Sequence, residues 1–172
     1  MSLPGREESL AAPGKRWTEV LVAAALALCV AILGGLATDI GPWYRALNKP
    51  AFQPPDWLFG PAWTLIYALI TAAAVKAWRA AGDRRGRQWI VGLFGFNLTL
   101  NVLWSLLFFS ARRPDWAMFE VVFLWASIAA LIWTIYPRSK SAAWLLVPYL
   151  SWVTFASLLN MAIVQLNPSL GR

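Results

Sequence analysis

Aromatic and amide side chains recur at helical spacing in three separate stretches of this chain. Trp63 and Tyr67 are four residues apart and Asn101 and Trp104 are three apart, so each pair occupies one face of a helix. A longer stripe at the same spacing lies in the last apolar stretch and comprises Trp152, Phe155, Ala156, Leu159 and Asn160. Aromatic rings stack on flat apolar molecules, and amides add a few directed hydrogen bonds. These residue types at this spacing predict an aromatic pocket with a few polar contacts.

Most catalytic and metal chemistry is excluded by what the sequence lacks. It has no histidine, which removes His-ligated metal or haem and every histidine general base. Its one cysteine, Cys29, cannot form an intrachain disulfide. We find no hydrolytic triad, metal site or nucleotide-binding loop. We therefore assign no catalytic residue, metal ion or cofactor, and only photo-oxidation through tryptophans and dioxygen is left open as enzymatic chemistry.

The elements that position these side chains are predicted to be five transmembrane helices. Only 13% of the residues are charged, against roughly 25% in a soluble domain. Uncharged runs cover residues 20–37, 57–75, 88–111, 121–137 and 141–171. Each run, with its flanks, is long enough to cross a bilayer as a helix, whereas barrel strands would alternate over about 10 residues. We predict an all-α membrane protein with a disordered tail at 1–16, one domain at 17–167, and spans at about 18–38, 57–79, 88–110, 115–136 and 142–166.

Positive charges gather at the ends of these spans, as membrane anchors do. The net charge of +7 therefore does not indicate nucleic-acid binding, and we expect no nucleic-acid partner. Of the 15 Lys and Arg residues, ten lie on the side that holds the N-terminus and five on the other side. The positive-inside rule predicts that the ten-charge side faces the inner compartment. Which membrane hosts the protein is left open.

The long connection after the first span combines rigidity with aromatic content. Residues 39–57 contain four prolines, which fix the backbone and remove donors, so we expect neither helix nor sheet there. They also contain four aromatic residues, a type that is rare in disordered segments. We interpret this loop as an ordered lid over the bundle. The alternative is an interfacial loop that rests its aromatic side chains on lipid headgroups.

The polar and aromatic positions fall at similar depths on the side of this loop. At 1.5 Å per residue, Trp63 lies roughly 8 Å, Asn101 about 16 Å and Trp152 about 21 Å below that side. Polar groups within a membrane face the bundle interior, so we predict an aromatic pocket beneath the lid. In contrast, Trp125 and Trp133 are interpreted as lipid-facing or packing residues.

Two simpler interpretations compete with the pocket. Amides inside a bundle also join helices, which would account for Asn97, Asn101 and Asn160. A carboxylate near the loop side, Glu120, would pair with Arg112, Arg113 or a helix N-terminus.

Four motifs follow one another along the chain. The loop reads Trp43-Tyr44-x-x-Leu47-x-Lys49-Pro50, followed by Pro54-Pro55-x-Trp57. The next three are Pro61-x-Trp63-Thr64-x-x-Tyr67, Leu100-Asn101-x-x-Trp104 with Phe108-Phe109, and Pro148-Tyr149-Leu150-x-Trp152-x-x-Phe155-Ala156-x-x-Leu159-Asn160. From the first span to about Asn167, this order resembles the TspO/translocator protein family, also called tryptophan-rich sensory proteins.

The resemblance implies a five-helix bundle that is often dimeric, so a homodimer is expected. It implies binding of porphyrins such as protoporphyrin IX, and in some members of sterols and isoquinoline-type ligands. Matched by motif, the ligand-binding residues are Trp43, Tyr44, Trp63, Tyr67, Asn101, Trp104, Trp152, Phe155, Ala156 and Leu159. We add Trp57, Asn97 and Phe109 from the same motifs and helix faces. Trp63 and Trp152 match the tryptophans implicated in light-dependent porphyrin breakdown.

The chain departs from the family pattern at a few places. Asn97 stands where many members have Gln, and Glu120 where Asp is common. Met161 and Gln165 occupy the places of the Tyr and the Arg or Lys in the proposed sterol segment, which argues against sterol recognition there.

The leading hypothesis is a membrane protein, surrounded by lipid, that binds a porphyrin or other flat hydrophobic ligand to sense, sequester or transport it. Alternatives are a light-dependent porphyrin-degrading enzyme, a sterol- or lipid-binding transporter, and a plain interaction partner. The chain shows no internal repeat, which argues against an actively coupled transporter.

Overall fold

The computed structural model describes residues 13–168, with side chains from residue 17 onward. Its elements are α1 (Pro13–Ala37), α2 (Pro42–Ala46), η1 (Asp56–Leu58), α3 (Phe59–Ala80), α4 (Arg84–Ser105), η2 (Leu106–Ser110), α5 (Pro114–Ile135), α6 (Lys140–Leu145) and α7 (Val147–Leu166). No strand occurs in this described part, and the all-α prediction is confirmed. The predicted tail at residues 1–12 lies outside the described residues, whereas residues 13–16 already belong to α1.

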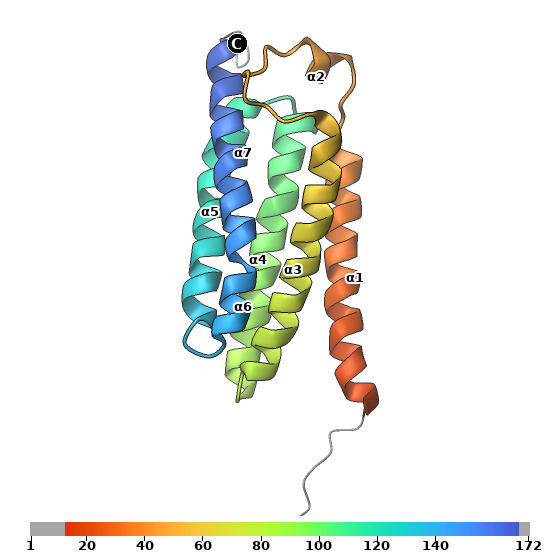
Figure 1. Cartoon of the computed structure of the whole chain (residues 1–172), viewed down its shortest axis with the longest axis vertical. Coiled ribbons are helices and arrows are strands. Elements are labelled where there is room, and N and C mark those ends of the chain that lie inside the picture. Colours follow the sequence, from red (N-terminus) through yellow and green to blue (C-terminus); the bar gives the residue numbers. More distant parts are fainter. Residues whose placement is uncertain (1–12, 169–172) are drawn as a thin grey trace, which may run out of the picture.

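Five helical stretches are long and apolar enough to cross a membrane, as predicted. They cover Trp17–Ala37, Asp56–Ala80, Arg84–Ser110, Pro114–Ile135 and Lys140–Leu166. The helices run side by side, and the loop that carries α2 covers the end of the bundle at which α7 finishes (Figure 1). Helix α1 packs against α3 and α4, while α5 packs against α4 and α7. The protein is therefore an integral multi-pass membrane protein.

The loop contains more helix than its prolines predicted. Pro42 is the first residue of α2. Proline is tolerated at this position because the first N–H groups of a helix have no acceptor within the helix, so the missing N–H removes no hydrogen bond. A 3-10 turn, η1, begins at Asp56, directly after Pro55. The prediction of neither helix nor sheet in this loop was wrong for these two short elements.

Helix α4 begins earlier than the uncharged run suggested. The carboxylate of Asp83 accepts a hydrogen bond from the Gly86 amide at 2.8 Å, which caps the helix. The predicted start at Gln88 was wrong because it was placed at the first residue of the uncharged run. The Asp83 cap starts the helix at Arg84, so the arginines before Gln88 belong to the helix.

The last span is interrupted, although one continuous helix was predicted at 142–166. Pro148 has no N–H to donate back to the preceding turn, and the helix breaks at Leu146 between α6 and α7. The leucine at this break is fully buried, so core packing holds the two pieces together.

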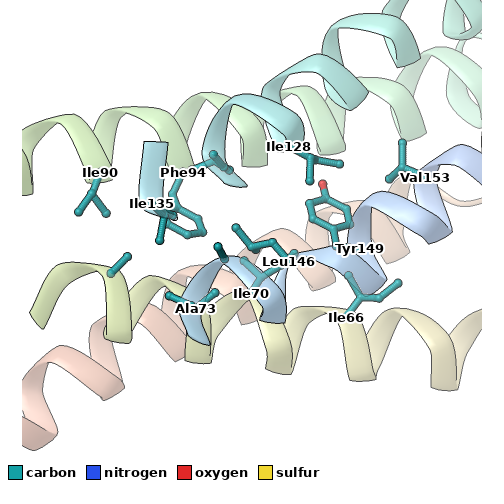
Figure 2. Close-up of a cluster of buried hydrophobic side chains, with 14 of the residues drawn as sticks. Ile66, Ile70, Ala73, Ile90, Phe94, Ile128, Ile135, Leu146, Tyr149 and Val153 are labelled. Carbon is teal, nitrogen blue, oxygen red and sulfur yellow. The ribbon is translucent and has the colours of Figure 1, made fainter. Parts of the chain in front are cut away.

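Buried side chains of four spans pack together along the bundle. Ile128, Leu131, Leu146 and Tyr149 have no exposed surface, and Ile70 and Phe94 pack in the same cluster (Figure 2). Figure 2 also shows that Tyr149 carries a hydroxyl into this apolar cluster. This core sets the rotation of each helix, and thereby the direction of the side chains nearer the loop.

Candidate ligand-binding site

A first group of stacked rings lies between α3 and α7. Trp63 stacks on Tyr67 with ring centroids 5.5 Å apart and meets Trp152 edge to face at 6.5 Å. Tyr149 lies 6.3 Å from Trp63, and Phe155 lies 5.8 Å from Trp152. We call these five residues the Trp63 cluster. The i and i+4 spacing within α3, and the i and i+3 spacing within α7, turn the rings of both helices toward one another.

A second group of rings joins the end of α4 to the loop. Trp104 stacks on Phe108 at 5.0 Å and contacts Phe109 at 6.1 Å. From the loop, Trp43 reaches Phe108 at 6.2 Å and Tyr44 reaches Phe109 at 5.7 Å. We call these five residues the Trp104 cluster. It supports the interpretation of the loop as an ordered lid.

A π-helical turn, η2, builds the second cluster. The Ala111 amide donates to the Leu106 carbonyl at 2.8 Å, a bond that spans five residues instead of four. This wider turn lets both Phe108 and Phe109 face Trp104, which a regular α-helix would not allow. The turn ends at Ser110, and Arg112 two residues later has a φ of 55°, in the left-handed region.

Three helices are joined by a hydrogen-bonded chain at the base of the Trp63 cluster. The Tyr67 hydroxyl donates to Asn101 Oδ1 at 2.7 Å, and Asn101 Nδ2 donates to the Tyr149 hydroxyl at 3.3 Å. Helix α1 also approaches this point, because a Cβ added at Gly34 would lie 3.8 Å from the Tyr67 hydroxyl. Tyr149 was not among the predicted site residues, although its place three residues before Trp152 was a usable signal.

The other two amides join helices, as the simpler interpretation proposed. Asn97 donates to Ser127 Oγ at 2.8 Å and so links α4 to α5. Asn160, with its amide oriented to satisfy both atoms, donates to the Pro114 carbonyl at 3.1 Å and accepts from the Met118 amide at 3.2 Å. Asn97 therefore takes part in the contact between α4 and α5.

Glu120 does not form the ion pair that the sequence suggested. Arg113 binds Asp115 instead, with Nε 2.8 Å from Oδ1, and the Arg112 guanidinium lies 5.9 Å from the ring of Trp43. Glu120 is only 6% exposed, and neither carboxyl oxygen has a hydrogen-bond partner among the described residues. The predicted pairing was wrong because each arginine finds a nearer partner at its own end of the helix.

Three further polar atoms are buried without a partner in the described part of the chain. They are Oδ1 of Asn97 and the indole Nε1 atoms of Trp104 and Trp152. The two indole donors belong to the ring clusters, and the oxygens of Asn97 and Glu120 add three buried acceptors in the bundle. Buried polar groups are nearly always paired, so such a group of unpaired atoms is typical of a binding site.

Three predicted ligand-binding residues remain, Leu159, Ala156 and Trp57, and Trp57 alone of these lies apart from the rings. Leu159 is buried and Ala156 is half-buried on the helix that carries Trp152. Trp57 is 71% exposed and lies outside both clusters. Trp125 and Trp133, interpreted as lipid-facing or packing residues, are 41% and 84% exposed.

The loop is held by polar contacts of its own. The Tyr44 hydroxyl donates to Asp56 Oδ1 at 3.3 Å and accepts from Gln53 Nε2 at 3.2 Å. The Lys49 ammonium lies 3.8 Å from the centre of the Tyr44 ring and 4.0 Å from the Asp56 carboxylate. Tyr44 is thus enclosed by the loop on one side and by Phe109 on the other.

This enclosure predicts an unusual titration of Tyr44. Burial, together with the nearby Asp56 carboxylate, raises the pKa of Tyr44 to about 12. An open loop would ionise this phenol near pH 10, so the stability of the closed loop falls as pH rises from about 10 to about 12. We expect the ultraviolet difference spectrum between the wild type and Tyr44→Phe to show phenolate only near pH 12. Ionisation of Tyr44 near pH 10 would contradict the closed loop.

A second anchor ties the loop to the end of α7. Asn167 Oδ1 accepts from the Asn48 amide at 2.9 Å, and its Nδ2 donates to the Asn48 carbonyl at 2.9 Å and the Ile163 carbonyl at 2.8 Å. The Asn48 side chain adds only a longer bond, 3.3 Å, to the Leu166 carbonyl.

Asn167→Ala is therefore expected to loosen the loop. Hydrogen exchange of the Asn48 amide should become about tenfold faster, because about 1–2 kcal/mol of hydrogen bonding is lost. Asn48→Ala is the matched control, since it keeps the backbone partners of Asn167 and should change exchange much less. Equal exchange in Asn167→Ala and the wild type would show that the anchor does not hold the loop.

The geometry of the clusters decides how a ligand could enter. Centroid separations of 4.7 to 6.5 Å mean that neighbouring rings touch. A flat ligand would therefore have to part these rings or the loop above them, and would then replace ring contacts by its own. The arrangement is suited to binding a planar apolar molecule with a few polar groups.

The fold and this site define the class: a five-span membrane protein with tryptophan-rich ring clusters beneath an ordered loop. The sequence profile of the TspO/MBR family matches residues 22–166. The chain is 42% identical over 150 residues to tryptophan-rich protein TspO of Archaeoglobus fulgidus, which covers 86% of this chain and 96% of that protein. It is 38% identical over 151 residues to tryptophan-rich protein TspO of Chlorobaculum tepidum (83% of this chain, 96% of the relative). It is 34% identical over 126 residues to human translocator protein (73% of this chain, 75% of the relative). The chain belongs to the TspO/MBR family.

Proposed function

We propose that this protein binds porphyrins of the protoporphyrin IX type between the Trp63 and Trp104 clusters, for sensing, sequestration or transport. The observation that carries the proposal is the convergence of Trp63 and Trp152 above the chain of Tyr67, Asn101 and Tyr149. Indole faces stack on a flat macrocycle, and the unpaired polar atoms nearby accept its polar groups.

The charged propionates of such a ligand belong at the loop end of the site. Arg112 is exposed there and lies over the Trp43 ring, so its guanidinium is available to a carboxylate at the edge of the Trp104 cluster. We expect no iron ligation by histidine, since the chain has none.

Titration of the full chain in detergent with protoporphyrin IX tests the proposal. Tryptophan fluorescence should be quenched saturably, at about one ligand per chain, because the ligand stacks on indoles. Trp133→Ala is the control, since Trp133 is 84% exposed and should leave this curve unchanged. Quenching that rises linearly without saturation would indicate partition into micelles and would reject the site.

Light-dependent oxidation of the porphyrin by dioxygen is a second candidate activity. The contact between Trp63 and Trp152, and the unpaired Nε1 of Trp152, support it because both indoles would adjoin the macrocycle. Illuminated complexes should lose their porphyrin spectrum more slowly in Trp63→Phe/Trp152→Phe protein than in Trp133→Phe protein. Equal rates in both would exclude a role for these two tryptophans.

A further inference from the structure

A hollow of about 180 Å³ lies at the end of the bundle opposite the loop, far from both aromatic clusters. It forms where α3 and α5 end and α4 begins. Buried Ala77, Ile90 and Ile135 line its apolar floor, and Trp89, Thr134 and Arg138 line its more exposed edge. The ligand-binding role proposed above makes no use of this hollow.

The surroundings of the hollow are strongly basic. The two turns at this end and the helix ends beside them carry seven cationic residues, Lys76, Arg79, Arg84, Arg85, Arg87, Arg138 and Lys140. Two carboxylates of the described residues lie at this end: Glu19 accepts from Arg79 Nε at 3.0 Å, and Asp83 caps α4 through the Gly86 amide. A surplus of positive charge therefore remains around the hollow.

Arg138 is the cation that lines the hollow itself. Its Nη1 donates to the Thr134 carbonyl at 3.2 Å, which holds the guanidinium at the edge of the cavity. A guanidinium has several further N–H donors in a fixed plane, and these match the oxygens of a phosphate.

We propose that this hollow binds the phosphate and glycerol region of an anionic phospholipid, with Arg138 in contact with the phosphate. The apolar floor would contribute nothing to the binding of inorganic phosphate, whereas it suits the glycerol and the first acyl carbons of a lipid. Trp89 is 61% exposed, as expected for an indole at the headgroup level. Phe96 and Phe123, 57% and 63% exposed, lie farther along α4 and α5, where the acyl chains would run.

Competition between two lipids with equal acyl chains tests the site. The full chain is equilibrated in micelles with equal amounts of phosphatidylglycerol and phosphatidylcholine, and the bound lipids are counted by native mass spectrometry. The wild type should retain phosphatidylglycerol preferentially, and Arg138→Gln should lower the ratio of the two bound lipids by about fivefold. Arg45→Gln, at the other end of the bundle, removes the same charge and should leave the ratio unchanged, since Arg45 contacts only the loop, through the Ile40 carbonyl at 3.2 Å, among the contacts of the described residues.

Two further measurements distinguish binding in the hollow from a general attraction of anionic lipid to the basic end of the bundle. Thr134→Phe keeps every charge but fills the hollow, so the preference for phosphatidylglycerol should fall as in Arg138→Gln. Inorganic phosphate at constant ionic strength should not displace the lipid. The proposal is overturned if the wild type shows no preference, or if Arg138→Gln and Arg45→Gln behave alike. It is also overturned if Thr134→Phe keeps the preference, or if inorganic phosphate competes. Circular dichroism confirms that each variant is folded.

Discussion

Alanine at both Trp63 and Trp152 is expected to weaken binding of protoporphyrin IX by at least about a hundredfold. Each indole contributes a stacking surface, and the loss of one ring contact with its buried area costs about 1–3 kcal/mol. Because the two rings touch, their contributions are coupled, and the double variant removes the indole surface that the Trp63 cluster offers to the ligand.

The affinity is best followed through the absorbance of the porphyrin itself, since these variants remove the fluorescent reporters. Each single variant should lose about tenfold in affinity. Trp57→Ala and Trp133→Ala are matched controls, because both tryptophans are largely exposed and lie outside the clusters. If the double variant binds within about twofold of the wild type, the ligand does not stack on these indoles.

Methionine at Glu120 is expected to make the protein more stable, by about 1–3 kcal/mol in free energy of unfolding. The wild-type carboxyl is 6% exposed and has no partner for either oxygen in the described part of the chain. Burial of an unpaired polar group is unfavourable, whereas methionine fills a similar volume without polar oxygens.

Thermal unfolding in detergent measures this effect, at about 2–4 °C per kcal/mol for a chain of this size. Glu19→Met is the control, and it should lower the melting temperature. Glu19 accepts hydrogen bonds from Trp78 Nε1 at 3.1 Å and Arg79 Nε at 3.0 Å, and the variant loses both. A lower melting temperature in Glu120→Met would show that the carboxyl has a stabilising partner, such as a bound water, and would reject the account of Glu120 as unpaired.

The spans, and the common depth of Trp63, Asn101 and Trp152, could be predicted because both depend on position along a single helix. Charge-free length identified five spans, and depth at a fixed rise per residue placed Trp63, Asn101 and Trp152 below the same loop. The structure brings Trp63 and Trp152 into contact and links Asn101 to Tyr67 of the same cluster. The predicted ends of the helices were less accurate. The start of α4 depends on the Asp83 cap and the break before α7 on the missing N–H of Pro148, and the length of an apolar run does not reveal such single hydrogen bonds.

The partner of each polar side chain depended on how the helices rotate against one another. Asn101 and Asn97 lie one turn apart on α4, yet one joins the ring cluster and the other binds Ser127 on α5. Trp57 and Trp63 belong to neighbouring motifs, yet only Trp63 faces the other rings. The periodicity of one helix cannot distinguish these cases. It shows which residues share a face of the helix, but not which neighbouring helix that face packs against.

The sequence by itself determined that this chain crosses the membrane five times and concentrates tryptophan, amide and proline on one side, because hydropathy and spacing are properties of each segment alone. Only the tertiary structure decided that Tyr149 completes the hydrogen-bonded chain and that η2 turns two phenylalanines onto Trp104. It also decided that Glu120 finds no hydrogen-bond partner among residues 17–168. These contacts arise where several helices pack at once, and the shared core fixes their rotations together.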